Sequence, residues 1–351
     1  MKKIAIFQSN LNVGGIQKSL INLLNNIPKE KYEIDLYLFS NVNFFDENIP
    51  SNINKILLKK PSFCCKFIPF SLFKKIYNIN INNKKYDISI DFDSYQHVTA
   101  LGAIAANSKK KVMWIHNDVQ KKLKEEKKYR ILHFFFKGKY KYFDKFIGVS
   151  KGVIKPFKEI TKMYDKEYDV IANLIPTENL IEKSNEDIDI KIDKKKYNVC
   201  TVGRLCHQKG IDILLNEISK VIIIRKNIHF YIIGDGPDKN NLLSQTKLLL
   251  LDKYVTFLGN QSNPFKYMKK MDAFVLTSRY EGQGMVLWEA HALGLKLIFS
   301  KHLEIYNEGL IGTENIVNEL INSKKNVKKI NKLEKYNSNI INKICNLFNG
   351  S

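Results

Sequence analysis

Residues 278–290 read SRYEGQGMVLWEA, and this stretch decides the fold because it joins a glycine-rich loop to a helical pattern. The apolar run just before it, 273–276, predicts a buried strand. A strand that leads through glycines into a helix points free backbone N–H groups and the positive end of the helix dipole at an anion. Phosphate is the ligand that this arrangement favours. Glu281 and Glu289 could accept hydrogen bonds from hydroxyl groups at the two ends of one long ligand.

Short apolar runs alternate with helical patterns along the whole chain, the order that builds parallel sheets from βαβ units. Helical patterns lie between the runs, as at 16–25, 210–221 and 241–250. Each half of the chain is therefore expected to form a doubly wound sheet. The expected strands are 4–8, 34–39, 88–92, 111–115, 145–149 and 170–174 in the first half, and 198–202, 229–233, 255–258, 273–276 and 296–299 in the second.

Length and composition leave room for two domains. The 351 residues, 44% of them apolar, are enough for two cores of ordinary size. Five cysteines without a paired spacing give no sign of a zinc site, so we expect a reduced, cytoplasmic protein. The first apolar run, 4–7, is too short for a signal peptide, and no stretch reaches the roughly 18 apolar residues of a membrane-spanning helix.

A second motif follows the expected strand 198–202. Gly203 ends the strand, Arg204 follows it, and Lys209 stands five residues later at the start of a helical pattern. The guanidinium is a forked donor and the ammonium a point charge, so together they can neutralise a departing pyrophosphate. In a chain with 57 basic residues such a pair is weak evidence alone, and its position upstream of residues 278–290 strengthens it.

The two motifs together resemble those of the family-4 retaining glycosyltransferases of the GT-B fold, the glycosyl transferases group 1. The hallmark of that family is a pair of glutamates eight positions apart, which Glu281 and Glu289 match, and its G-R-L and K-G segments match residues 203–205 and 209–210. The resemblance spans nearly the whole chain. It implies an α/β fold of two Rossmann-like doubly wound domains that face a central cleft.

The resemblance also implies which residues of the second half contact the donor. Glu281 would contact hydroxyl groups of the transferred sugar and Glu289 the ribose. Arg204 and Lys209 would stabilise the leaving diphosphate, so no metal and no cofactor is expected. The further donor-binding residues that it implies are Gly203, Gly234, Gly236, Gly282, Gln283, Gly284, Met285 and Val286. For Gly234 and Gly236, a purely structural tight turn is the alternative.

Three residues of the first half complete the implied site. Gly14 and Gly15 follow the first expected strand and would let the backbone approach the donor or acceptor. His116 ends the expected strand 111–115, where the family places a histidine against the donor sugar. A histidine that only bonds to nearby backbone is the alternative.

Two features stand outside the resemblance. Asp91 and Asp93 form the Asp-x-Asp pattern that holds a divalent metal in the other glycosyltransferase fold, GT-A. We expect this pattern to be fortuitous, because Arg204 and Lys209 already provide diphosphate recognition. The segment 301–306 reads KHLEIY where relatives have a glycine-glycine-proline-glutamate turn, which leaves the details of this loop open.

Three segments are expected along the chain. Residues 1–190 would form an acceptor-binding domain, 191–330 a nucleotide-sugar-binding domain, and 331–351 a C-terminal helix. The boundary is placed within 178–196, where polar residues dominate and no apolar period survives. Residues 330–348 carry a helical stripe of apolar residues, and the GT-B resemblance implies that this helix packs back on the first domain.

The predicted function is a retaining, metal-independent glycosyltransferase. It would move a sugar from a nucleotide-sugar, with UDP favoured, to a glycan or lipid-linked glycan in bacterial surface polysaccharide synthesis. One alternative is a GT-B nucleotide-sugar epimerase, against which the glutamate pair argues. The other is a basic nucleic-acid-binding protein, but no such motif accompanies the net charge of +22, and both halves of the chain share that charge.

Two basic, aromatic segments predict one further partner. Residues 59–75 and 109–145 interleave lysines with phenylalanines and tyrosines. Lysines near an anionic lipid surface favour binding to it, so we predict peripheral association with the inner face of the cell membrane. The alternative is that the aromatic residues belong to the core and the lysines are ordinary solvated charge.

Overall fold

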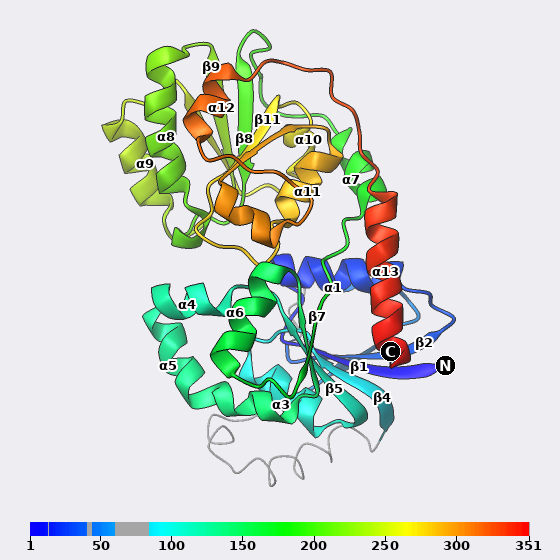
Figure 1. Cartoon of the computed structure of the whole chain (residues 1–351). Coiled ribbons are helices and arrows are strands. Elements are labelled where there is room, and N and C mark those ends of the chain that lie inside the picture. The colour runs from blue at the N-terminus through cyan, green and yellow to red at the C-terminus, as the bar shows by residue number, and fades with distance from the viewer. Residues whose placement is uncertain (13, 41–43, 60–83, 351) are drawn as a thin grey trace. The chain divides into compact units, whose positions relative to one another are not determined.

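The computed structural model describes residues 1–12, 14–40, 44–59 and 84–350. The chain forms two compact units, one of Met1–Leu174 with Lys335–Ser351 and one of Ile175–Glu334. Each unit is a parallel sheet covered by helices (Figure 1). The α/β architecture predicted from the sequence is thus confirmed.

The first unit is built on a sheet in which every neighbouring pair of strands is parallel. In sheet order, its strands are β3 (Asn54–Leu57), β2 (Tyr32–Leu38), β1 (Lys2–Gln8), β4 (Lys85–Asp91), β5 (Asn107–Ile115), β6 (Lys145–Gly148) and β7 (Glu167–Val170). Since β1 pairs with β2 on one side and with β4 on the other, the order of the strands reverses at β1. Crevices that bind ligands open at the carboxyl ends of strands at such a reversal.

The helices of the first unit include the last helix of the chain. Tyr32, at the start of β2, donates a hydrogen bond to the carbonyl of Cys345 (3.4 Å) and meets the ring of Phe348 edge to face at 5.1 Å. The buried stripe of this helix thus packs on residues from the start of the chain. The helices are α1 (Gly15–Asn26), α3 (His97–Ala105), α4 (Val119–Glu125), α5 (Lys127–Phe136), α6 (Lys151–Thr161) and α13 (Glu334–Asn349), with the 3-10 segments η1 (Asp46–Asn48) and η3 (Lys137–Tyr142).

The edge strands of this sheet differ from the prediction. The expected strand 170–174 is wrong, because β7 lies at Glu167–Val170 and only its last residue was included. The apolar residues after it form an extended link, whose Leu174 carbonyl accepts a hydrogen bond from Asn22 (3.1 Å). β3, at Asn54–Leu57, was not predicted. Both strands are largely polar and partly exposed, so they lack the apolar run that marks a central strand.

The second unit repeats the plan with a smaller parallel sheet. In sheet order, its strands are β10 (Val255–Gly259), β9 (Ile228–Ile233), β8 (Tyr197–Val202), β11 (Ala273–Leu276) and β12 (Lys296–Phe299). Its helices are α7 (Thr177–Ser184), α8 (Ile211–Ile224), α9 (Lys239–Leu248), α10 (Phe265–Met268), α11 (Met285–Ala292) and α12 (Ile316–Asn322), with the 3-10 segments η4 (His207–Lys209) and η5 (Lys301–Tyr306).

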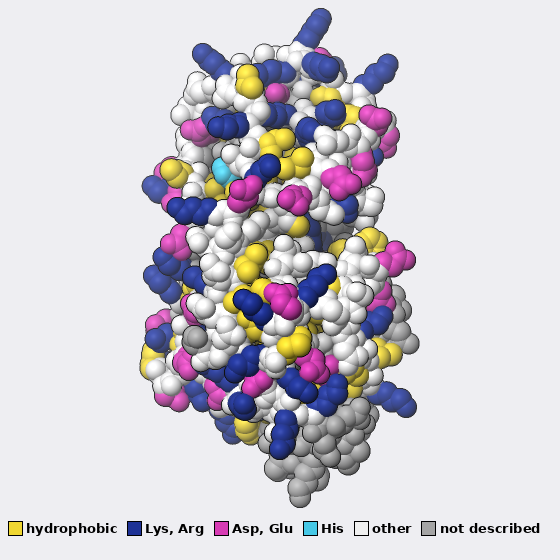
Figure 2. Space-filling model, turned by 90° about the vertical axis from the view of Figure 1, so that its right-hand side faces the viewer, with side chains coloured by type: hydrophobic (Ala, Val, Ile, Leu, Met, Phe, Trp, Pro, Cys, Tyr) yellow, Lys and Arg dark blue, Asp and Glu magenta, His cyan; other side chains and the backbone are white. Residues whose placement is uncertain are grey.

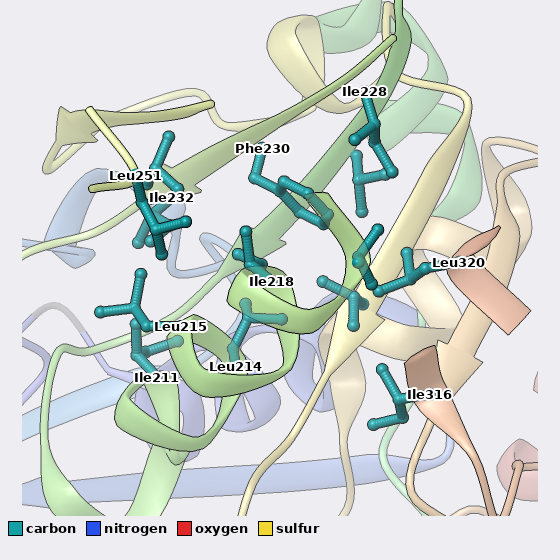
Figure 3. Close-up of a cluster of buried hydrophobic side chains, with 14 of the residues drawn as sticks. Ile211, Leu214, Leu215, Ile218, Ile228, Phe230, Ile232, Leu251, Ile316 and Leu320 are labelled. Atoms are coloured by element: carbon teal, nitrogen blue, oxygen red, sulfur yellow. The ribbon is translucent and has the colours of Figure 1, made fainter. Parts of the chain in front are cut away.

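The core of the second unit lies between this sheet and helix α8. Leu214, Leu215 and Ile218 of α8 face Phe230 and Ile232 of β9 (Figure 3). The spacing of the three leucine and isoleucine residues places them on one side of the helix. Burial of this stripe fixes α8 against the sheet, so the loop that precedes the helix, from β8, is held at the carboxyl end of that strand.

The link between the two units is more ordered than its composition suggests. α7 occupies Thr177–Ser184, within the segment expected to lack an apolar period, and packs on α10 and α11. Leu180 is buried by this packing. The division into units falls after Leu174, whereas the sequence pattern predicts it after residue 190.

Basic side chains are spread over the surface. On the face shown in Figure 2, Lys and Arg are interspersed with Asp and Glu, and no single basic patch dominates it. Within the described residues, no helix is long and apolar enough to cross a membrane. Positive charge alone therefore does not single out a binding surface on this face.

Candidate functional site

The two motifs of the second half meet at the point where the order of its strands reverses. β8 and β11 are neighbours, although the chain between them passes through β9 and β10. Gly203 and Arg204 follow β8, and Ser278 and Glu281 follow β11. Because parallel strands bring their carboxyl ends to one edge of the sheet, both motifs lie where a ligand is expected.

Lys209 and Glu281 form the centre of this site. Lys209 Nζ lies 2.7 Å from Glu281 Oε1, and the Ser278 hydroxyl donates to the same oxygen at 2.7 Å. The Lys209 side chain is 21% exposed and that of Glu281 is 5% exposed. The buried carboxylate thus holds the ammonium group at the rim of the sheet, where an anion could still reach it. Among the described residues only Oε1 of Glu281 accepts hydrogen bonds, which leaves Oε2 for a ligand hydroxyl.

A second ion pair fixes the loop that carries Glu281. Arg279 binds Asp212 through two bonds, of 2.8 and 2.6 Å, and also donates to the carbonyl of His207 at 2.7 Å. The side chain of Gln208 donates to the Tyr280 carbonyl at 3.1 Å. A guanidinium held in this bidentate way loses little freedom when a ligand binds. The loops after β8 and β11 are therefore tied together on both sides of the Lys209–Glu281 pair.

Arg204 differs from Lys209 because no carboxylate in the described part of the chain holds its side chain in place. Its side chain is exposed and makes no hydrogen bond or ion pair with any described residue. It follows Gly203, where an added Cβ would lie 3.4 Å from Cε of Lys209. The two predicted cations therefore belong to one short, tightly turned segment, in which one is held by a carboxylate and the other is free to meet an anion.

Gly234 and Gly236 form a turn after β9 that packs on this segment. Gly234 has φ of +143°, and a Cβ there would lie 1.9 Å from the Gly203 carbonyl oxygen. A Cβ at Gly236 would lie 2.2 Å from the Leu205 carbonyl oxygen. Only glycine fits either position. The alternative that Gly234 and Gly236 form a purely structural tight turn therefore has direct support, since this turn shapes the loop that carries Arg204.

The glycine loop before α11 is also held in place. The Gly284 amide donates to the Asn307 side chain at 3.1 Å, and the Met285 amide donates to the Gln283 carbonyl at 2.8 Å. Two of the amides predicted to bind the donor are thus already paired in this structure. Glu289 is buried in the second turn of α11. Gly282, Gln283 and Val286 lie in the same loop and first helical turn.

Three side chains that support the site were not predicted. Ser278 bonds to Glu281, Asn307 bonds to the Gly284 amide, and His302 Nε2 bonds to the Ser278 carbonyl at 3.0 Å. Ser278 stands in the quoted motif, and its position two residues after a strand is the signal that could have found it. His302 and Asn307 lie in or next to the segment that departs from the family pattern, so no motif pointed to them.

The other predicted residues, Gly14, Gly15 and His116, lie in the first unit. Gly14 precedes α1, whose first residue is Gly15, and its carbonyl accepts from Lys18 at 3.0 Å. Val13, quoted with them in the motif, lies outside the described residues. His116 follows β5, and burial lowers its pKa to about 3, so the ring is neutral. Among the described residues, its Nε2 has no hydrogen-bond partner.

The Asp-x-Asp pattern is buried in the first unit beside a lysine. Asp91 ends β4 and is fully buried, and Asp93 accepts a hydrogen bond from Ser9. Lys139 donates to the Ser94 carbonyl at 2.7 Å, and its charge lowers the pKa of both aspartates against the larger, opposite effect of burial. These carboxylates thus face an internal cation. Within the described part of the chain, no group of three or more His, Cys, Asp or Glu side chains is placed to hold a metal ion.

The arrangement in the second unit suits a ligand that carries both phosphate and hydroxyl groups. A free guanidinium, a partly exposed ammonium and a helix N-terminus can bind an anion. The carboxylates of Glu281 and Glu289 can accept from hydroxyl groups. A nucleotide joined to a sugar has this combination of groups.

Comparison with known proteins agrees with this geometry. Residues 182–343 match the family model Glycosyl transferases group 1. The chain is 28% identical over 278 residues to an uncharacterized glycosyltransferase of Methanocaldococcus jannaschii, covering 75% of this chain and 68% of that protein. It is 26% identical over 315 residues, or 86% of this chain and 81% of the other, to the Campylobacter jejuni N-acetylgalactosamine-N,N'-diacetylbacillosaminyl-diphospho-undecaprenol 4-alpha-N-acetylgalactosaminyltransferase.

Solved structures match the chain over its full length. Anabaena HepE in complex with UDP and glucose aligns over all of both chains with a TM-score of 0.73 at 17% identity. The lipopolysaccharide outer core galactosyltransferase WaaB aligns over 97% of this chain and 99% of that one, with a TM-score of 0.63 at 17% identity. At such identities the likeness shows the fold, which is GT-B. The family model Glycosyl transferases group 1 therefore matches the part of the chain that carries both motifs, and over most of its length the chain is similar to glycosyltransferases of the GT-B fold.

Proposed function

We propose that the protein is a retaining glycosyltransferase that transfers a sugar from a UDP-sugar to a lipid-linked glycan. The observation that carries the proposal is the Lys209–Glu281 pair at the carboxyl ends of β8 and β11, beside the free Arg204. In this proposal Arg204 and Lys209 bind the diphosphate, Glu281 binds hydroxyl groups of the sugar, and Glu289 binds the ribose.

The proposed reaction requires the protein to stabilise a leaving group. The bond between C1 of the sugar and the diphosphate oxygen breaks, and the diphosphate leaves with its negative charge. Lys209 is held by Glu281 before the reaction and stabilises that charge without reorganising, and the unpaired guanidinium of Arg204 and the N-terminus of α11 add to this stabilisation. The acceptor hydroxyl attacks C1 from the same face, and its proton passes to the departing phosphate oxygen. The linkage formed is α if the donor is α-linked.

The choice of donor and acceptor rests on relatives. Anabaena HepE has been solved with UDP, and the Campylobacter relative is named for a diphospho-undecaprenol acceptor. Both proteins match more than four fifths of this chain. We assign donor binding to the second unit, which contains the cations and the glutamates, and acceptor binding to the first. Synthesis of bacterial surface polysaccharide is the role that fits these assignments.

A thermal-shift series with nucleotides and nucleotide-sugars tests the proposal. A ligand that binds only the folded protein adds about 2.7 kcal/mol to its stability at 100 times its Kd. UDP and one UDP-sugar should raise Tm, and Lys209→Met should abolish the rise. Lys220→Met is the matched control, because Lys220 forms only an exposed pair with Glu217 in α8, and it should keep the rise.

Product analysis then separates the possible reactions. With the UDP-sugar that raises Tm and a lipid-linked acceptor, NMR should show a new linkage that retains the donor's anomeric configuration. An isomerised sugar formed without acceptor would indicate an epimerase instead. Absence of any Tm rise with nucleoside diphosphates would contradict the proposed donor site.

Metal dependence provides an independent test. If Arg204, Lys209 and backbone amides neutralise the diphosphate, turnover should be unchanged by EDTA. Activity measured as UDP release, with and without the chelator, checks this. Loss of activity that Mn²⁺ restores would contradict the proposed role of the two cations and redirect attention to Asp91 and Asp93.

A further inference from the structure

The segment 300–313 follows β12, includes the residues that do not match the family motif, and forms a closed loop. The Thr313 amide donates to the Phe299 carbonyl at 2.7 Å, and the Lys301 amide donates to the Thr313 carbonyl at 3.0 Å. Within this segment, Leu303 is completely buried. Compact loops whose ends lie close together and that pack on their own side chains are frequently functional. We call the segment the η5 loop, because the 3-10 segment η5 lies in it.

The η5 loop holds both ends of the loop that carries Glu281, here called the donor loop, which runs from Ser278 to Gly284. At its start, His302 Nε2 lies 3.0 Å from the Ser278 carbonyl oxygen. Because a carbonyl oxygen only accepts, the histidine is the donor in this contact. At its end, the Gly284 amide donates to Asn307 Oδ1 at 3.1 Å. Glu281 stands midway in sequence between these two tied points.

Asn307 is part of the interior of the second unit. It is 1% exposed, and its Nδ2 donates to the Leu303 carbonyl at 3.0 Å, so both ends of the carboxamide are bonded. A Cβ at Gly284 would lie 3.1 Å from Oδ1 and 3.2 Å from Nδ2 of Asn307, closer than an ordinary contact. The absence of a side chain at Gly284 therefore lets the buried carboxamide reach the backbone of the donor loop.

We propose that Asn307 and His302 are positioning residues for the transfer reaction. They fix the two ends of the donor loop, and so the direction in which Glu281 presents its carboxylate to the sugar. The Gly284 amide stays bonded to Asn307 with or without a donor. This inference rests on the proposed function, from which it takes the sugar-binding role of Glu281.

The donor loop is tied on two sides, and the η5 loop supplies one of them. Arg279 and Gln208 tie it to the loop after β8, whereas His302 and Asn307 tie it to the segment after β12. Loss of the second set would leave Glu281 on a loop that is held from one side. A misplacement of about 1 Å in a group that positions substrate lowers the rate by up to roughly 100-fold.

Kinetics and calorimetry of Asn307→Ala test the proposal. With the UDP-sugar that raises Tm, kcat should fall by roughly 10- to 100-fold. The Kd for UDP should stay nearly unchanged, because Lys209 and Arg204 keep their places. A failure of the proposed function appears in the unchanged protein, which would bind no UDP, and that result overturns both proposals. A failure of the positioning role alone appears as a variant with full kcat.

Asn263→Ala is the matched control for loss of a buried asparagine. Asn263 is also buried in the second unit, where it accepts from the Phe265 amide at 3.1 Å and donates to the Lys183 carbonyl at 2.7 Å. These bonds join α7 and α10 and do not involve the donor loop. Both alanine variants should lower Tm, but only Asn307→Ala should lower kcat. If Asn307→Ala lowers Tm alone, as Asn263→Ala does, Asn307 is merely structural and the proposal is overturned.

His302 allows a test that leaves the core intact, because the residue is exposed. His302→Ala removes the donor to the Ser278 carbonyl, whereas His302→Gln offers an amide N–H in its place. We expect kcat to fall in the alanine variant and to be largely restored in the glutamine variant, with nearly the same Tm in both. Equal kcat in the two variants would contradict a positioning role for His302.

A double-mutant cycle shows whether Asn307 acts through Glu281. If it does, Glu281→Ala with Asn307→Ala should lose no more turnover than Glu281→Ala alone, since coupled residues are not additive. Independent losses that multiply would overturn the proposal. So would tighter UDP binding by Asn307→Ala, which would mean that Asn307 competes with the ligand for the Gly284 amide. Equal losses of UDP affinity and kcat would show that the η5 loop positions the diphosphate site instead.

Discussion

The two units each place a lysine and carboxylates next to the strand where the order of the sheet reverses, but in opposite environments. In the second unit, Lys209 is 21% exposed and pairs with Glu281. In the first unit, Lys139 is 8% exposed and lies near Asp91 and Asp93. The same topology therefore yields a site that a ligand can reach and a charged centre that it cannot.

The difference shows that the solvent exposure of the lysine, more than the types of residue around it, distinguishes a ligand-binding site from a structural charge cluster in this protein. A partly exposed ammonium can exchange its protein partner for a phosphate at small cost. A buried one must keep its partner, because an unpaired charge in the interior is strongly destabilising. We therefore expect substitutions at Lys209 to affect turnover and those at Lys139 to affect folding.

The largest expected effect is that of Lys139→Met on stability. Removing the buried cation leaves Asp91 and Asp93 without compensation, which should cost about 3–5 kcal/mol of unfolding free energy. Urea unfolding monitored by circular dichroism measures it. Lys209→Met should cost much less in the same assay. Equal losses of unfolding free energy in the two variants would show that Lys139 and Lys209 contribute to stability in the same way.

The pH dependence of stability should isolate the contribution of Asp91. Burial raises its pKa from 3.8 to about 7, opposed by the charge of Lys139. The folded protein therefore holds a proton that the unfolded chain has lost between these pH values, so stability is greatest below the lower value and falls as pH rises to about 7. At 1.36 kcal/mol per pKa unit, the fall is at most about 4 kcal/mol.

Asp91→Asn is the variant that reveals this effect, because it keeps the shape and cannot ionise. Relative to the unchanged protein, it should gain stability as the pH is raised from 4 to 8. Urea midpoints of both proteins at several pH values provide the measurement. A constant difference between them across this range would mean that Asp91 does not titrate with a raised pKa.

Lys209→Met should lower turnover in addition to weakening nucleotide binding, with little effect on the stability of the ligand-free protein. Loss of one fixed group that stabilises transition-state charge lowers kcat by about 10²–10³. Steady-state UDP release measures this, and a near-normal Tm would show that the variant folds. Lys220→Met should leave kcat unchanged, because that lysine forms only a surface pair. Similar losses in both variants would indicate a general effect of charge.

The sequence predicted the apolar strands well and the polar edge strands of the first sheet poorly. β11 lies at the predicted 273–276, because a central parallel strand is buried on both faces and reads as an unbroken apolar run, and the edge strand β12 lies at the predicted 296–299, because its sequence KLIF is mostly apolar. β3 and β7 are edge strands with polar residues, so apolar patterning missed the first and displaced the second. α7 was not predicted because it is short and only one side of the helix is buried.

The site was predictable in its residues but not in its pairings. Motifs identified Arg204, Lys209 and Glu281, yet the ion pair between the last two joins positions 72 residues apart. Only the adjacency of β8 and β11 brings them together. His302 and Asn307 could not have been found, since they lie in or next to the segment 301–306, which does not match the motif of the family. The burial of Asp91 could not be predicted either, because it depends on side chains from several elements.

The most direct test of the proposed donor site compares Glu281→Ala with Glu289→Ala by calorimetry with UDP and by kinetics. Glu281→Ala should lower turnover while leaving UDP affinity nearly unchanged, because Lys209 stays available to the diphosphate. Glu289→Ala should weaken UDP and donor alike by about 10- to 150-fold, the value of a charged hydrogen bond of 1.5–3 kcal/mol. Equal loss of UDP affinity in both variants, or full activity in both, would contradict the proposed roles of the two glutamates.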